Sequence, residues 1–185
     1  GIGTWALGVV IGLLTALVAL GLALIYRANR IINFAQGDLG TVPTTIAVGL
    51  IAVSGLPYLV GLVAGVGVAV LLGVVIEVFI VRRFFRAPRL LLTVATIGLS
   101  QLLTVIGLLL PRWWGVTTFV GASLPQPFPG EVQVGTVTLH GHELLALILA
   151  PLLLAGLAVF LRGTDVGIAV RASAERADRA ALLGV

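Results

Sequence analysis

The sequence predicts an all-α membrane protein, a polytopic transmembrane helical bundle with about five spans. Two observations support this fold class. Of the 185 residues, 59% are hydrophobic and only 10% are charged, whereas soluble domains carry about 25% charged residues. The hydrophobic residues also occur in long runs, each near the ~20 residues that a membrane-crossing helix needs. So few charges cannot build a water-soluble surface, and insertion into a bilayer accounts for both observations.

The expected elements alternate between apolar runs and short polar loops. The runs cover residues 5–26, 31–53, 58–81, 90–110 and 144–161. A long external loop is expected at 111–142, and a polar tail at 162–185. Residues 1–185 are expected to form one transmembrane domain. Because methionine is absent, even at residue 1, we expect the chain to be a fragment of a longer protein.

The orientation of the spans follows from the arginines, which supply all 11 basic groups. Only Arg112 lies in the loops on one side, and the other arginines lie in the opposite loops and in the tail. The positive-inside rule therefore places the tail in the cytoplasm and residue 1 outside. Topology thus explains the net charge of +4, and we expect no nucleic-acid partner. Trp5, Tyr58, Trp113 and Trp114 fall at outer helix ends, as an aromatic belt requires.

Two local patterns predict contacts within the fold. Apolar and polar residues alternate on both sides of Gly135-Thr136, which predicts a small external hairpin at 132–139. Small residues also recur at four-residue spacing, and such stripes let helix backbones approach closely in lipid. The stripes are Gly8, Gly12 and Ala16 in the first run, and Gly61, Gly65, Ala69 and Gly73 in the third.

The run at 31–53 differs from the others because its first half is polar. Its polar or helix-breaking residues are Asn33, Gln36, Gly37, Asp38, Gly40, Thr41, Pro43, Thr44 and Thr45. On a continuous helix, four of these would share a face, whereas the glycines and the proline could break the helix. Broken helices line substrate sites in transporters. The alternative is the cytoplasmic end of an ordinary helix, with residues 33–38 at headgroup level, and the residues leave both interpretations open.

Other residues could carry chemistry. An acid inside a membrane, as Glu77 would be, is a functional candidate, but it can also pair with Arg82 or Arg83 at the interface. His140 and His142 are too few for a metal site in a chain without cysteine, so no metal is expected. The chain has no Gly-x-x-x-x-Gly-Lys phosphate loop, so we expect no nucleotide hydrolysis by this chain itself.

The tail predicts a short cytoplasmic helix, since alanine, leucine, arginine and glutamate favour helix. Val170, Ala174, Ala177 and Ala181 form a small apolar stripe at helical spacing. Such a stripe fits a groove on a partner protein. The alternative is a helix that lies on the bilayer surface.

Four segments, in order, resemble a known family. Residues 31–39, Ile-Ile-Asn-Phe-Ala-Gln-Gly-Asp-Leu, resemble the signature of LivH-type permeases, the membrane subunits of bacterial ABC importers for branched-chain amino acids. Glu77 with Arg82-Arg83 resembles the family's glutamate and basic loop. Residues 96–100, Thr-Ile-Gly-Leu-Ser, resemble another family segment. Residues 167–185 resemble the family's coupling loop, so the tail at 162–185 is expected to be the cytoplasmic coupling loop of this chain.

The resemblance implies a permease subunit of the bacterial inner membrane that carries branched-chain amino acids or related amino acids and amides. It implies as partners a second permease, identical or not, cytoplasmic ATPases, and a periplasmic or lipoprotein substrate-binding protein. ATP would be used by the ATPases, so the chain would be no enzyme, hold no cofactor and have no catalytic residue. Further helices would follow residue 185. The implied translocation path is Asn33, Gln36, Gly37, Asp38 and Thr41. The implied coupling residues are Gly167, Arg171, Ala172, Glu175, Ala180 and Leu183.

Two other functions remain open from the residues. One is an ion-coupled secondary transporter with Asp38 or Glu77 as its proton site. The other is an intramembrane protease that uses Ser54 with His140 or His142. Dependence on an ATPase would separate the first from an ABC permease, and loss of turnover in Ser54→Ala would identify the second.

Overall fold

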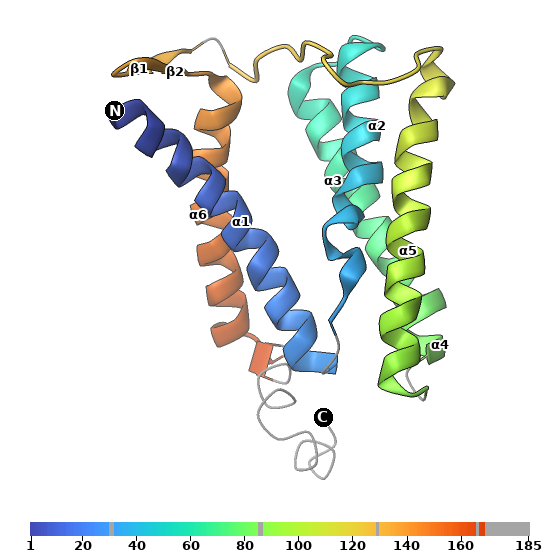
Figure 1. Ribbon diagram of the computed structural model, residues 1–185. Coiled ribbons are helices and arrows are strands. Elements are labelled where there is room, and N and C mark those ends of the chain that lie inside the picture. Colours follow the sequence, from blue (N-terminus) through green and yellow to red (C-terminus); the bar gives the residue numbers. More distant parts are fainter. Residues whose placement is uncertain (30–31, 85–86, 129, 166, 169–185) are drawn as a thin grey trace. The chain divides into compact units, whose positions relative to one another are not determined.

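The computed structural model describes residues 1–29, 32–84, 87–128, 130–165 and 167–168, and it is mainly helical (Figure 1). Among these residues, four helices are long and apolar enough to cross a membrane, at Ile2–Arg27, Tyr58–Val81, Leu90–Trp114 and Gly141–Gly163. They match four of the predicted runs and confirm an all-α polytopic membrane protein. The remaining run, 31–53, is not a continuous helix.

The chain divides into two compact units, which are described separately. The first consists of Gly1–Ile32 and Phe128–Val185. In it, α1 (Ile2–Asn29) packs against α6 (Gly141–Gly163). Many of their large apolar side chains are exposed, and of those in the described residues only Val10 is buried, as suits lipid-facing helices.

The predicted hairpin is present in this first unit. Strands β1 (Val132–Val134) and β2 (Val137–Leu139) pair antiparallel, with Val134 opposite Val137. Gly135 makes the turn with φ of 65°, a conformation that glycine adopts without strain. The hairpin lies over the start of α1, where a Cβ on Gly3 would meet Val137 Cβ at 2.6 Å. The hairpin is therefore packed against α1 of its own unit.

The second unit, Asn33–Pro127, contains the broken run and the central helices. Its elements are η1 (Phe34–Gln36), η2 (Asp38–Gly40), α2 (Thr41–Ala52), α3 (Tyr58–Ile76), the π-helical η3 (Glu77–Val81), α4 (Arg82–Phe84), α5 (Arg89–Leu109) and η4 (Leu110–Trp114). A buried cluster holds them together through Ala35, Val42, Ile76, Leu99, Leu103 and Leu110. Because this cluster joins residues from the broken run to α3 and α5, the break is part of the core.

The glycine stripe of the third run packs as predicted over half of its length. Cβ atoms added to Gly61 and Gly65 would collide with Ile51 and Ala47 of α2, so the two helices approach at van der Waals distance. Around Gly73 in this unit and Gly8 in the first, no described atom lies within 4 Å of such a Cβ. Among the described residues, the glycines of this stripe therefore contact another helix at Gly61 and Gly65 and not at Gly73.

Candidate functional site

The broken run begins with two short turns in place of a helix. The side chain of Asn33 caps η1 by accepting a hydrogen bond of 3.0 Å from the backbone N–H of Ala35. Regular α-helix starts only at Thr41. Pro43 lies in the first turn of α2, where its missing N–H costs nothing, whereas in a longer helix its ring would collide with the carbonyl of Leu39. The sequence signal for a break at Gly37, Gly40 and Pro43 was therefore correct.

A polar stripe on α5 supplies the partners that the broken run needs. Thr96, Ser100 and Thr104 occur at four-residue spacing and so share one helix face. Thr96 is 4% exposed, and its hydroxyl accepts a hydrogen bond of 3.2 Å from the backbone N–H of Phe34. The same hydroxyl donates to the carbonyl of Thr93 at 2.7 Å. A buried backbone donor freed by the break is thereby paired, as burial requires.

Asp38 is held by the same stripe. Its Oδ2 accepts a hydrogen bond from the hydroxyl of Ser100, and its Oδ1 lies 3.4 Å from the hydroxyl of Thr104. Both contacts are partly buried. The half-buried carboxylate of Asp38 is thus held against α5 by hydroxyl groups. The sequence analysis did not name Ser100 and Thr104 as site residues, although the four-residue spacing of hydroxyl side chains on this apolar helix was visible.

Gln36 has a side-chain oxygen without a hydrogen-bond partner in the described part of the chain. This oxygen, Oε1, is buried. Buried acceptors are normally paired, and an unpaired one commonly marks a site for water or a ligand. Gly37 next to it is exposed, and no described atom would touch a Cβ there. Four of the five predicted path residues, Asn33 to Asp38, therefore lie together in the two short turns.

The fifth path residue, Thr41, borders a cavity of about 340 Å³. The cavity is bounded by α2, α5 and the segment 117–120, and Thr45 and Thr104 also line it. Gly107 lets α5 approach here, since a Cβ on it would collide with Cγ2 of Thr41. Pockets that bind small molecules start at about 300 Å³, so the cavity is large enough for a small solute.

Glu77 forms a local ion pair. Its Oε1 lies 4.0 Å from Nε of Arg82, with the side chains 54% and 74% exposed. The π-helical stretch η3 makes this possible, because the backbone N–H of Arg82 bonds to the carbonyl of Glu77. This i,i+5 geometry turns the two residues toward one side. The predicted pairing with Arg82 is present, and an exposed pair of this kind contributes little stability.

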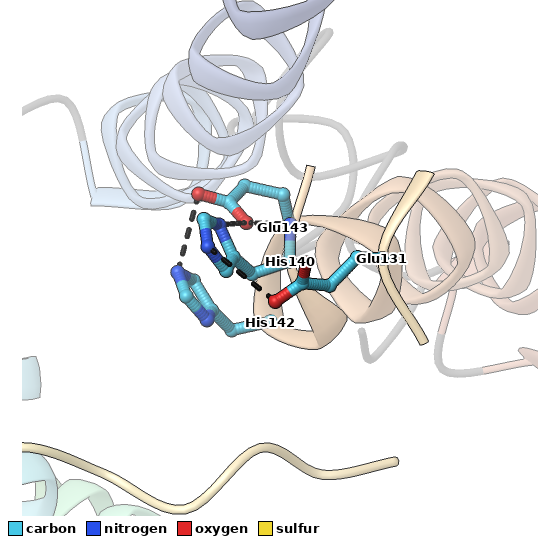
Figure 2. Close-up of polar contacts among 4 residues, drawn as sticks. All are labelled: Glu131, His140, His142 and Glu143. Atoms are coloured by element: carbon cyan, nitrogen blue, oxygen red, sulfur yellow. Dashed lines mark hydrogen bonds and ion pairs between the residues drawn. The ribbon is translucent and has the colours of Figure 1, made fainter. Parts of the chain in front are cut away.

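The histidines cap α6. His140 donates its backbone N–H to Oε2 of Glu143 at 2.7 Å, and His142 Nε2 lies 3.1 Å from Oε1 of the same carboxylate (Figure 2). His140 also lies 4.0 Å from Glu131, just before β1. Within the described ranges no group of His, Cys, Asp and Glu has the geometry for a metal ion. Ser54, the protease candidate, accepts a hydrogen bond of 3.2 Å from the indole of Trp114.

The start of the predicted coupling loop forms a sharp corner. Thr164 ends α6 with its hydroxyl donating to the carbonyl of Phe160 at 2.7 Å, and the same oxygen accepts from the backbone N–H of Gly167 at 3.0 Å. Ile168 N–H bonds to the carbonyl of Thr164 at 2.9 Å, which starts a new helical turn. A Cβ on the buried Gly167 would lie 2.6 Å from Cα of Leu161.

The remaining coupling residues, Arg171, Ala172, Glu175, Ala180 and Leu183, and the predicted tail helix lie outside the described residues. The capping role of Thr164 was not predicted. Threonine is a common N-cap residue, whose side-chain oxygen accepts a hydrogen bond from a backbone N–H two or three residues later.

Comparison with known proteins gives one match. A family model described as the permease component of the branched-chain amino acid transport system matches residues 5–185. No curated protein and no solved structure matches the chain.

Proposed function

The chain belongs to the family of permease components of branched-chain amino acid transport systems, and on this premise we propose that it is the membrane subunit of an ABC importer. It forms the translocation path for branched-chain amino acids or related small amino acids and amides. The observation that carries this proposal is the broken run, whose polar turns are bonded to a hydroxyl stripe on α5. Irregular backbone at membrane depth is tolerated where it is buried in protein or lines a path for solutes.

We assign the path to Asn33, Gln36, Gly37, Asp38 and Thr41. Three features support this assignment: the unpaired oxygen of Gln36, the exposed backbone at Gly37, and the cavity at Thr41. The carboxylate of Asp38 is fixed by two hydroxyls. A fixed charge inside an apolar bundle costs free energy, and a role in transport explains why the chain carries it.

We assign coupling to the tail from Gly167 onward, including Arg171, Ala172, Glu175, Ala180 and Leu183. The corner at Thr164 supports this, because it sets the direction in which the chain leaves α6. Cytoplasmic ATPases would bind this tail, and their closure would switch the access of the path. The sequence has no phosphate loop, so ATP hydrolysis falls to those partners.

The further partners are a second permease subunit and a periplasmic or lipoprotein binding protein, with the complex in the bacterial inner membrane. An ion-coupled carrier is the rival function, with Asp38 or Glu77 taking up the proton. Both oxygens of Asp38 lie within hydrogen-bond distance of hydroxyls on α5, so this carboxylate is already engaged within the protein.

Transport in proteoliposomes tests the proposal. We expect uptake of leucine by the full-length permease to require its ATPases, its binding protein and ATP, and to persist when a protonophore collapses any proton gradient. Uptake by the permease alone, driven by a proton gradient and without ATP, would overturn the proposal in favour of the ion-coupled carrier.

A further inference from the structure

The cavity between α2, α5 and the segment 117–120 has a lining of mixed polarity. Thr104 and Thr45 belong to it, and the hydroxyl of Thr104 lies 3.4 Å from Oδ1 of Asp38. Val48, Leu108 and Phe119 are apolar residues of the lining, and Thr44, Thr117 and Thr118 are further polar ones. An amphipathic cavity of this type fits a small solute with one polar end and one apolar end.

Thr45 and Thr104 offer hydrogen-bond acceptors to the cavity. Thr45 donates its hydroxyl proton to the carbonyl of Thr41 at 2.8 Å. Thr104 has two acceptors within reach, the carbonyl of Ser100 at 3.0 Å and Oδ1 of Asp38 at 3.4 Å, and one proton to give. A hydroxyl that already donates its one proton to a protein acceptor can only accept a hydrogen bond from a ligand. Thr45 and Thr104 therefore accept from a solute and do not donate to it.

The electrostatics beside Thr104 also favour a donor. Oδ1 of Asp38 lies 3.4 Å from the hydroxyl of Thr104, and a charge is only weakly screened in an apolar bundle. No arginine or histidine is among the described residues that line the cavity. Beside Thr104 a carboxylate would meet lone pairs and a negative charge, whereas an N–H group, above all an ammonium, would be stabilised.

We propose that this cavity is a solute-binding site within the permease that recognises the N–H-donating end of the solute, an ammonium or a primary amide, at the hydroxyl of Thr104 beside Asp38. The inference rests on the proposed transport function and adds the recognition chemistry. The permease thus recognises the nitrogen of the solute and not its carboxylate.

Binding of tritiated leucine to the full-length permease complex, purified without its binding protein, tests this. The competitors are 3-methylbutylamine, 4-methylpentanamide and 4-methylpentanoate, which share the apolar body. The first carries an ammonium, the second an amide and the third only a carboxylate. We expect the amine, the amide or both to displace leucine, and 4-methylpentanoate to fail at a concentration at least tenfold higher. Displacement by 4-methylpentanoate as strong as that by the amine and the amide would overturn the proposal.

Variants locate the site. Thr104→Val removes the acceptor, and we expect leucine binding to weaken about tenfold or more, the usual effect of losing a hydrogen bond to a charged group. Thr104→Ser keeps the hydroxyl and should restore binding. The matched control is Thr15→Val on α1, whose hydroxyl, like that of Thr104, lies within hydrogen-bond distance of the carbonyl four residues earlier in its own helix. Equal affinity of Thr104→Val, Thr104→Ser and the control would overturn the assignment.

The transport assay separates the two proposals. If the complex takes up leucine in an ATP-dependent way but shows no leucine binding of its own, the cavity site is wrong and the transport function stands. If ATP-dependent uptake fails as well, the transport function itself is wrong and the cavity site falls with it.

Discussion

Thr104 on α5 reaches back to Asp38, so that two residues separated by 66 positions share a hydrogen bond of 3.4 Å. Ser100 binds the other oxygen of the same carboxylate. One charged residue of the broken run is thus fixed to a neighbouring helix at both oxygens. These contacts link the broken run to α5, which also lines the cavity.

Removing this charge should impair transport more than folding. We expect Asp38→Ala to insert and assemble but to lower leucine uptake about tenfold or more, because the bonds from Ser100 and Thr104 that hold the path residues against α5 are lost. We expect Asn33→Ala to lower uptake as well, since it uncaps η1. Uptake in proteoliposomes at matched protein levels is the measurement. Glu131→Ala, which removes an exposed acid outside the broken run, is the control, and wild-type uptake by both path variants would leave the headgroup interpretation.

The contact between α2 and α5 depends on a glycine. We expect Gly107→Ala to lower the thermal stability of the purified protein, because its Cβ would collide with Thr41, and overpacking costs roughly 1–3 kcal/mol. Gly98→Ala on the same helix is the matched control, since no described atom lies within 4 Å of a Cβ there. Thermal unfolding in detergent compares the two. Equal melting temperatures would show that the two helices are not in contact at Gly107.

The orientation in the membrane can be measured directly, since the chain has no cysteine of its own. We expect a cysteine at Gln133 to react with an impermeant thiol reagent in intact cells. A cysteine at Arg176 should react only after the membrane is permeabilised, because the arginine-rich loops stay in the cytoplasm. The reverse labelling pattern would invert the topology.

The sequence predicted the spans well, because the length of an apolar run is set by the thickness of the bilayer. The hairpin at 132–139 was equally predictable, since its alternation and Gly135 are local signals. The broken run was predicted only as one of two interpretations. Gly37, Gly40 and Pro43 indicate where a helix cannot continue, but they do not indicate which residues form hydrogen bonds with the polar groups of the run. Those partners, Ser100 and Thr104, come from a distant helix and could not be chosen without the fold. The π-helical turn at Glu77 depends on packing and has no sequence pattern of its own.

The corner after α6 carries the last prediction. Gly167 is buried against the end of α6, and a Cβ there would meet the carbonyl of Phe160 and Cα of Leu161. Gly167→Ala should therefore open the turn and change the direction of the tail, while the spans insert normally. Thr164→Val removes the hydroxyl that holds both sides of the corner, at a cost of about 0.5–2 kcal/mol for a lost cap.

If the tail couples the permease to its ATPases, both changes should lower ATPase copurification and leucine uptake together. Gly163→Ala is the control, because this neighbouring glycine has no described atom within 4 Å of a Cβ. Copurification and uptake are measured on the same membrane preparations, so that a loss of insertion would be recognised by its effect on protein level. Wild-type copurification and uptake in Gly167→Ala would mean that the direction of the chain at this corner is irrelevant. The tail would then be a helix on the membrane surface, and ATPase binding would have to be sought elsewhere on the permease.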